Sequence, residues 1–311
     1  MVKEGKINAI QGGRQVISPS YLAKILREKG LAPRRSQGQH FLVDENIRER
    51  ILAAASLSGN DYVLDIGAGP GALSLAMVDR VAGVIAIEQD RGLVELLKEE
   101  ADIRGLGGLK IIQGDVRRLD LEELCWQHWG GAVPGRKLAM LNIKVVANLP
   151  YYLTTPLLFQ LLQSRLPLKS LVLMVQLEVA RRINAEAGQK DYGLLTVLCQ
   201  YYTKPSFLFK VSRGVFMPRP AVDSAVVLLE PGARPNVQVS EETLFWEIAR
   251  AAFQKRRKTI LNALDGVAAQ GKAQWKELLK KADIEPGCRG ETLKLAEFAK
   301  LSEILYNKVV P

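Results

Sequence analysis

The stretch VLDIGAGPG (63–71) joins a short apolar run to a glycine-rich loop. Such a run, which begins at Tyr62, is typical of a buried strand. The glycines allow a sharp turn into a helix and the close approach of a ligand to the backbone. The spacing G-x-G-x-x-A, with Glu88 21 residues after Gly67, would by itself equally fit a dinucleotide-binding unit. The stretch therefore predicts a Rossmann-like strand, loop and helix and leaves the ligand open.

Outward from this loop, apolar strands alternate with helices. Besides the strand at 62–66 we expect strands at 84–88, 109–114, 145–148 and 170–176, with helices such as 93–104 and 156–165 between them. This alternation predicts a mostly parallel sheet that is covered by helices on both faces. Two further strands, at 207–211 and 223–229, could complete the sheet. The piece 116–142 is expected to be a surface excursion.

The flanking segments are expected to be helical. A helix over 18–30, capped by Ser18 or Ser20 and ended by Gly30, precedes a basic, polar arm, and Asp44 caps a helix that runs to about Leu57. After the loop PGARPN (231–236) we expect the helices 241–255, 272–282 and 294–307. The chain is thus divided into an N-terminal helix and arm (1–43), a Rossmann-like domain (44–235) and a helical C-terminal domain (236–311).

Composition narrows the class of protein. Of 311 residues, 48% are hydrophobic and 24% charged, which is ordinary soluble globular usage. Apolar runs such as 171–175 are far shorter than the ~18–20 residues of a membrane span, and the start of the chain has no apolar signal region. Three cysteines without a CxxC pair and two histidines argue against a disulfide framework and a metal site. We expect a cytoplasmic protein without metal.

The basic excess is segregated along the chain. Residues 1–50 carry 10 basic and 5 acidic side chains and residues 204–258 also carry 10 and 5, whereas residues 51–203 carry 15 and 16. Two basic segments on either side of a neutral middle suggest a rim that meets a polyanion, because each neutralised phosphate releases counterions. A generally basic soluble protein remains the alternative.

Three acidic residues are expected to meet beside the glycine-rich loop. Asp65, Glu88 and Asp115 stand at or just after the ends of predicted strands, at the edge where such sheets bind ligands. A pyrophosphate would be repelled by Asp65. S-adenosyl-L-methionine, with its ammonium, sulfonium, ribose diol and adenine amine, would suit three acids. Glu88 would then accept both ribose hydroxyls, and Asp115 the adenine amine. The alternative is that these acids only cap helices.

The fourth predicted strand ends in NLPY (148–151). An amine on a conjugated ring is a poor nucleophile, because its lone pair is delocalised into the ring. The Asn148 carboxamide oxygen and a backbone carbonyl of the Leu149-Pro150 turn can each accept one N–H and so hold the amine pyramidal, with its lone pair aimed at a methyl group. Tyr151 offers a face on which the base can stack. An Asn-Pro turn without catalytic function is the alternative.

At this point the motifs indicate a family. The chain closely resembles the small-subunit (16S) ribosomal RNA adenine N6,N6-dimethyltransferases over roughly residues 33–300. The motifs that carry the resemblance are GQHFL (38–42), VLDIGAGPG (63–71), IEQD (87–90), GDV (114–116), NLPY (148–151), KDYG (190–193), FMPRPAVDSAVV (216–227) and FQKRRKTILNAL (253–264). The resemblance implies a class I S-adenosylmethionine-dependent methyltransferase fold with a small helical C-terminal domain. Members dimethylate two adjacent adenines near the 3′ end of the small-subunit RNA, using four cofactor molecules.

The resemblance also implies roles for single residues. Those assigned to the cofactor are His40 and Leu42 at its methionine end, Gly67 beneath it, Glu88 at the ribose, Asp115 at the adenine and Asn148 near the reacting centre. Phe216 would be the second stacking face, opposite Tyr151, for a flipped base. The family usually has Asn where His40 stands, and often Phe where Gln37 stands.

The basic run Lys255, Arg256, Arg257 and Lys258 falls in a family block and is expected to contact ribosomal RNA phosphates; alone it would indicate only a solvated helix face. NLPY also fits methyltransferases of the Erm type, which act on large-subunit RNA. A third interpretation is a non-catalytic RNA-binding protein of ribosome assembly. We expect the first class, with the small ribosomal subunit and its 16S RNA as partner, no membrane, and a monomer.

Overall fold

The computed structural model describes residues 18–34, 38–130, 140–255 and 257–309. Its centre is a sheet with the strand order β4-β3-β2-β5-β6-β9-β7. The strands are β2 (Asp61–Ile66), β3 (Gly83–Glu88), β4 (Leu109–Gln113), β5 (Asn142–Asn148), β6 (Leu168–Gln176), β7 (Thr203–Val211) and β9 (Ser224–Pro231). From β4 to β6 neighbouring strands run parallel, and β9 and β7 complete the sheet in antiparallel pairings.

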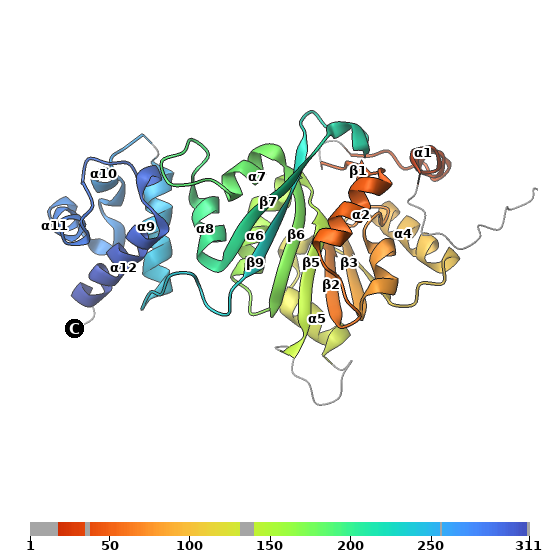
Figure 1. Cartoon of the computed structure of the whole chain (residues 1–311), viewed down its shortest axis with the longest axis horizontal. Coiled ribbons are helices and arrows are strands. Elements are labelled where there is room, and N and C mark those ends of the chain that lie inside the picture. The colour runs from red at the N-terminus through yellow and green to blue at the C-terminus, as the bar shows by residue number, and fades with distance from the viewer. Residues whose placement is uncertain (1–17, 35–37, 131–139, 256, 310–311) are drawn as a thin grey trace, which may run out of the picture.

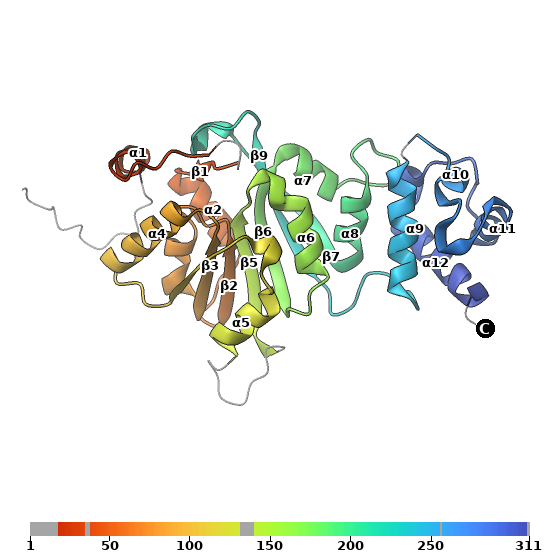
Figure 2. The ribbon, with the colours of Figure 1, turned by 180° about the vertical axis from the view of Figure 1, so that it is seen from behind.

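Helices cover both faces of this sheet, because alternate strand residues face opposite sides (Figures 1 and 2). Val63 belongs to a buried cluster that contains residues of α1 (Pro19–Glu28), α2 (Glu45–Ala54), α3 (Ser74–Met77) and α4 (Arg91–Ile103). Leu64, the next residue, belongs to the buried cluster on the other face, which contains residues of α5 (Leu121–Trp129), α6 (Thr154–Leu162), α7 (Leu177–Ile183) and α8 (Leu194–Tyr202). The expected α/β architecture is confirmed.

The predicted capping residues are confirmed at several helix ends. Ser18 accepts the N–H of Tyr21 at the start of α1, and Gly30 follows the helix at φ +64°, a conformation that glycine adopts without strain. Asp44 caps α2, as expected. That helix ends at Ala54 rather than near Leu57, because Ser56 has a φ of 46° that the helix cannot continue through.

The expectation that 116–142 forms only a surface excursion is wrong. Asp120 caps α5 within this piece, and the helix buries Leu121, Leu124, Cys125 and Trp129 against the sheet. The Trp129 ring lies 5.1 Å from that of Tyr62 on β2. Residues 131–139 lie outside the described residues. Apolar side chains at i, i+3 and i+4 therefore make α5 part of the core.

A second, two-stranded sheet joins segments that are far apart in sequence. β1 (Phe41–Leu42) pairs antiparallel with β8 (Phe216–Met217), and the N–H of Val43 donates to the carbonyl of Val215 at 3.0 Å. Two-residue strands carry no periodicity, so the sequence does not predict this pairing. It brings the GQHFL and FMPRP motifs together above the sheet.

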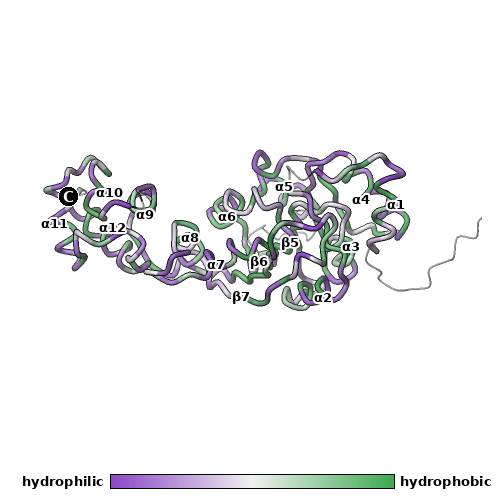
Figure 3. Tube along the Cα trace, turned by 90° about the horizontal axis from the view of Figure 1, so that it is seen from above, coloured by the Kyte–Doolittle hydropathy of each residue, from purple (hydrophilic) through white to green (hydrophobic). Residues whose placement is uncertain are grey.

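The described part of the chain after the sheet contains the α-helices α9 (Glu242–Gln254), α10 (Ile260–Leu264), α11 (Lys272–Ala282) and α12 (Leu295–Val309). They lie at one end of the long axis, beyond α8 (Figure 3). The Tyr201 ring of α8 lies 4.7 Å from Phe245 and 5.3 Å from Trp246 of α9, so aromatic packing joins them to the α/β part. No helix in the described segments is long and apolar enough to cross a membrane.

Candidate active site

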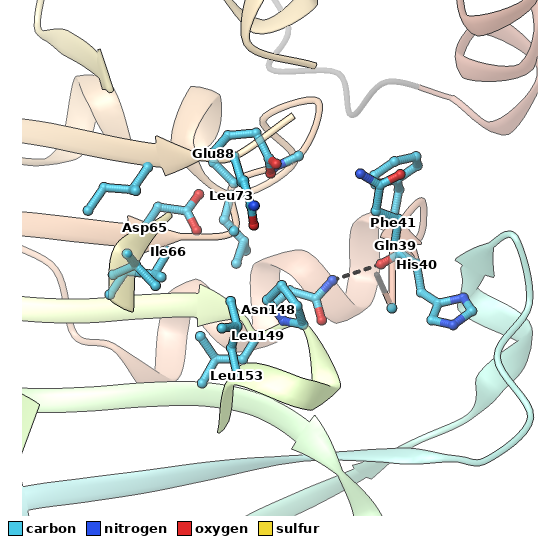
Figure 4. Close-up of a pocket in the computed structure, with 18 of the residues that line it drawn as sticks. Gln39, His40, Phe41, Asp65, Ile66, Leu73, Glu88, Asn148, Leu149 and Leu153 are labelled. Carbon is cyan, nitrogen blue, oxygen red and sulfur yellow. Dashed lines mark hydrogen bonds between the residues drawn. The ribbon is translucent and has the colours of Figure 1, made fainter. Parts of the chain in front are cut away.

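A cavity opens at the carboxyl ends of β2, β3 and β5 (Figure 4). Its walls come from residues within 38–42, 65–73, 87–89 and 148–153, with Gly114 and Val116 after β4. Counted together with its open mouth, the cavity measures about 870 Å³. The loops that carry the sequence motifs thus converge on one place.

The glycine-rich loop forms one wall of the cavity, with Gly67 and Gly69 among its lining residues. Gly67 has a φ of +74°, and its N–H donates to the carbonyl of Ile87 at 2.8 Å. A Cβ at this position would lie 2.6 Å from Cδ of Pro150 in the NLPY motif. Glycine is required here both by its conformation and by the close approach of the two loops.

Glu88 ends β3 and faces the cavity. Its Oε2 accepts the N–H of Gly69 at 2.9 Å and its Oε1 accepts the N–H of Asp90 at 2.8 Å. Burial raises the pKa of this carboxyl, since only 8% of the residue is exposed, and the N–H donors oppose the shift. Each oxygen can still accept another bond, which is the capacity that a diol needs.

Asp65 lines the cavity from the end of β2. It is fully buried, and burial raises its pKa to about 7, against a hydrogen bond from the hydroxyl of Ser74 that lowers it. A cation bound nearby would favour the ionised form.

Asp115 is the member of the acidic trio that stands apart. Gly114 and Val116 line the cavity, but Asp115 is not among the lining residues. Its carboxylate accepts Nε of Arg117 at 2.9 Å and Nη2 at 2.6 Å, and these hydrogen bonds hold its pKa below the usual value. This ion pair is not predicted by the motif that contains Asp115.

The Asn148 carboxamide is oriented by the neighbouring GQHFL segment. Its Nδ2 donates to the backbone carbonyl of His40 at 3.0 Å (Figure 4). Because nitrogen is the donor, Oδ1 is left as an acceptor, with no partner among the described residues. The geometry therefore presents an oxygen, as the mechanism read from NLPY requires.

The two aromatic residues are placed differently. Tyr151 lines the cavity, its ring is 5.6 Å from that of His40, and its hydroxyl is 3.2 Å from that of Ser224. Phe216 is 5% exposed, pairs with Leu42 across β8 and β1, and is not a lining residue. Its role as a second stacking face stays a prediction.

Tyr152 also lines the cavity, although the sequence motifs did not predict it as a site residue. It is 42% exposed, its hydroxyl donates to Gln89 Oε1 at 3.4 Å, and the Arg117 guanidinium lies 5.6 Å from its ring. Its position directly after NLPY was the available signal, although a tyrosine there would equally suit a core.

The basic run lies in the turn after α9 rather than on a helix face. Lys255, Arg257 and Lys258 are exposed there, and Arg256 lies outside the described residues. The neighbouring α10 and the β1–β8 pair lie toward the same edge of the elongated molecule (Figure 1).

The chemistry of the lining residues favours a ligand with positive charge and hydrogen-bond donors over a phosphate-rich one. Asp65 and Glu88 face the cavity, and no lysine or arginine is found among the described residues that line it. No group of three metal-ligating side chains occurs in the described ranges. An anionic cavity beside a glycine-rich loop, at the carboxyl edge of a mostly parallel sheet, fits S-adenosylmethionine. Fold and site together define a class I S-adenosylmethionine-dependent methyltransferase.

Comparison with known proteins narrows this class. The profile of the family described as Ribosomal RNA adenine dimethylase matches residues 30–304, and the chain belongs to this family. The Ribosomal RNA small subunit methyltransferase A of Pelotomaculum thermopropionicum is 46% identical over 291 residues, covering 93% of this chain and 96% of that protein.

Two solved structures are also similar. A dimethyladenosine transferase from Plasmodium falciparum matches with a TM-score of 0.70 at 25% identity, over 86% of this chain and 98% of that one. The 23S rRNA methyltransferase ErmE matches with a TM-score of 0.61 at 24% identity, over 85% and 99%, a likeness that concerns the fold alone. The cofactor of this chain is S-adenosyl-L-methionine.

Proposed function

We propose that this protein dimethylates the N6 amines of two adjacent adenines near the 3′ end of 16S ribosomal RNA and so takes part in the biogenesis of the small subunit. The observation that carries the proposal is the Asn148 carboxamide, which presents its oxygen at the rim of an anionic cavity. The small-subunit relative at 46% identity over nearly the whole chain supports the choice of subunit.

The cofactor residues follow from their places in the cavity. Glu88 binds the ribose hydroxyls, and Gly67 leaves room beneath the methionine end. His40, through its main chain, and Leu42 border that end. Asp115 is assigned to the adenine amine from its place after β4. It meets that amine through the lone pairs that Arg117 leaves unused.

The cofactor supplies a methyl group on a sulfonium. Asn148 Oδ1 accepts one N–H of the target amine. The other N–H is assigned to the carbonyl of Leu149, which directly follows Asn148, since one lone pair of the Pro150 carbonyl is engaged by the N–H of Leu153 at 2.9 Å. With both hydrogens held, the lone pair is directed at the methyl group. No strong base is required, since the leaving thioether is neutral and the product proton can pass to water.

Substrate binding uses aromatic and basic residues. Tyr151 stacks on the flipped adenine, worth ~1–3 kcal/mol, and Phe216 supports its other face. Lys255, Arg256, Arg257 and Lys258 contact RNA phosphates. The N-terminal part (1–43) and the helical part (236–311) extend this surface on either side of the methyltransferase domain (44–235). We propose that the protein acts in the cytoplasm, as a monomer, on the small subunit.

Methylation of purified subunits tests the proposal. Small subunits that lack the modification are incubated with the protein and isotope-labelled cofactor, and their RNA is analysed by mass spectrometry. We expect two dimethyladenosines near the 3′ end of 16S RNA. Label in large-subunit RNA would instead support an Erm-type function, and unlabelled RNA in both would leave an assembly factor.

Asn148→Ala tests the mechanism. The amide acts on the transition state, so the variant should methylate slowly at saturating substrates while its affinity for cofactor and subunits is unchanged. A wild-type rate would contradict the NLPY mechanism.

A further inference from the structure

His40 makes two hydrogen bonds that point to opposite sides of the site. Its backbone carbonyl accepts Nδ2 of Asn148 at 3.0 Å, and its ring Nδ1 lies 2.7 Å from the carbonyl of Pro218. A carbonyl can only accept, so Nδ1 is the nitrogen that carries the proton. The main chain of His40 thus orients Asn148, and its ring is hydrogen-bonded to the FMPRP motif.

The segment held by this ring is the one that carries the proposed stacking face. Pro218 directly follows β8, in which Phe216 pairs with Leu42. The His40 ring also lies 5.6 Å from that of Tyr151, whose hydroxyl is 3.2 Å from that of Ser224 in the longer block FMPRPAVDSAVV (216–227). His40 is half-buried between the two segments that would enclose the target base.

The imidazole is turned away from the acidic side of the cavity. In Figure 4 its ring points from the Asn148 bond toward β8, whereas Asp65 and Glu88 lie on the other side of Asn148. The side chain that the motif comparison assigned to the cofactor is therefore directed at the substrate side.

We propose that His40 is a positioning residue for the target adenine: its Nδ1–H holds the Pro218 carbonyl, and thereby Phe216, in register with Tyr151 and Asn148. The inference rests on the proposed function. It also explains how His can stand where the family usually has Asn. An Asn Nδ2 occupies nearly the same place as His Nδ1, one bond beyond Cγ, so either side chain can donate to this carbonyl.

Variants at this position separate the donor from the ring. His40→Phe keeps a flat ring beside Tyr151 but removes the donor. His40→Asn keeps a donor at the Nδ1 position but removes the ring. His40→Gln has its amide one bond farther out and so does not reproduce the donor. His128→Phe, on α5, is the control for the loss of a histidine.

The readouts are kcat and KM with unmethylated small subunits and, separately, cofactor affinity by calorimetry. For His40→Phe and His40→Gln we expect kcat to fall tenfold or more with cofactor affinity within twofold of wild type. His40→Asn should recover most of the lost rate, and His128→Phe should match wild type. If His40→Phe does not fold, the difference in kcat between His40→Asn and His40→Gln still tests the inference.

Two results would overturn the inference. If His40→Phe bound the cofactor more weakly but kept its kcat, the His40 side chain would be a cofactor-binding group and not a positioning residue for the adenine. Equal loss in the Asn and Gln variants would show that the donor is irrelevant. Failure of the wild-type protein to methylate small subunits would be a failure of the proposed function and not of this inference, which concerns differences among active variants.

Discussion

At the scale of single residues, the two buried carboxylates of the cavity differ in how they are satisfied. Glu88 accepts two backbone N–H groups, whereas Asp65 accepts the hydroxyl of Ser74. Burial raises the pKa of both. Glu88 is therefore suited to accept hydrogen bonds from a neutral diol, and Asp65 to respond to a nearby cation.

The first prediction concerns Glu88. Glu88→Ala removes two hydrogen bonds to a charged acceptor, each worth ~1.5–3 kcal/mol, so cofactor affinity should fall at least ~100-fold. Calorimetry with S-adenosylmethionine measures this. Glu95→Ala, on the exposed side of α4, is the control and should bind normally. Unchanged affinity in Glu88→Ala would remove Glu88 from the cofactor site.

The second prediction concerns pH. Burial raises the pKa of Asp65 to about 7, above the ~3.9 of an unfolded Asp, so the folded state binds the extra proton. The resulting stability is complete below about pH 4 and is lost as pH rises through about 7. Without cofactor, the free energy of unfolding of wild type relative to Asp65→Asn should fall over this window, by at most ~1.4 kcal/mol per pH unit.

Urea unfolding at several pH values gives this difference. Asp102→Asn, at an exposed position of α4, is the control and should show no such trend. A pH-independent difference between wild type and Asp65→Asn would show that the carboxyl is not protonated in the folded protein.

At the scale of elements, the close approach of two loops couples the glycine-rich loop to the NLPY motif. In Gly67→Ala the new Cβ would meet Pro150, at a φ that side chains rarely adopt. We expect lower stability and a disproportionately lower methylation rate, because the displaced Pro150 lies two residues after Asn148. Gly59→Ala, where a Cβ meets nothing within 4 Å, should be neutral. Methylation rates and urea midpoints check both, and similar behaviour of the two variants would contradict the coupling.

The sequence predicts those elements whose signal is local. The strands at 62–66 and 84–88 and the caps at Ser18 and Asp44 follow from apolar runs and from N-cap chemistry. The β1–β8 pair could not be predicted, because two residues have no period and their partners are far apart in the chain. Helix α5 is hard to predict because WGGAVPGRK, which begins at its last residue, is typical of a loop, although Asp120 and the apolar spacing are consistent with a helix.

At the scale of the whole molecule, topology brings the candidate site together. Gly67, Glu88 and Asn148 were predictable as neighbours because parallel strands place their carboxyl ends at one edge. Three interactions at the site could not be predicted: the Asp115–Arg117 ion pair, the Asp65–Ser74 hydrogen bond and the hydrogen bond between the His40 ring and Pro218. They depend on how side chains approach in space, which no spacing in the sequence records.

The last prediction tests the basic rim. Replacing Lys255, Arg256, Arg257 and Lys258 with Gln removes up to four phosphate contacts, and each should flatten the slope of log affinity against log salt by somewhat under one unit, ~0.7–0.9. Filter binding to small subunits at three salt concentrations measures the slope. Cofactor affinity should not change, because none of the described lining residues of the cavity belongs to this run.

A matched control carries the same change in charge elsewhere. Lys98, Lys110, Arg165 and Lys169 belong to the neutral middle of the chain and are exposed. Lys110 and Lys169 stand near the amino ends of β4 and β6, the edge opposite the cavity. Replacing these four with Gln should leave the salt slope close to that of wild type if RNA contacts are confined to the rim. If the salt slope were flattened equally in the two quadruple variants, net charge alone would attract the subunit. If the slopes of both variants and wild type were the same, the basic run after α9 would be ordinary surface.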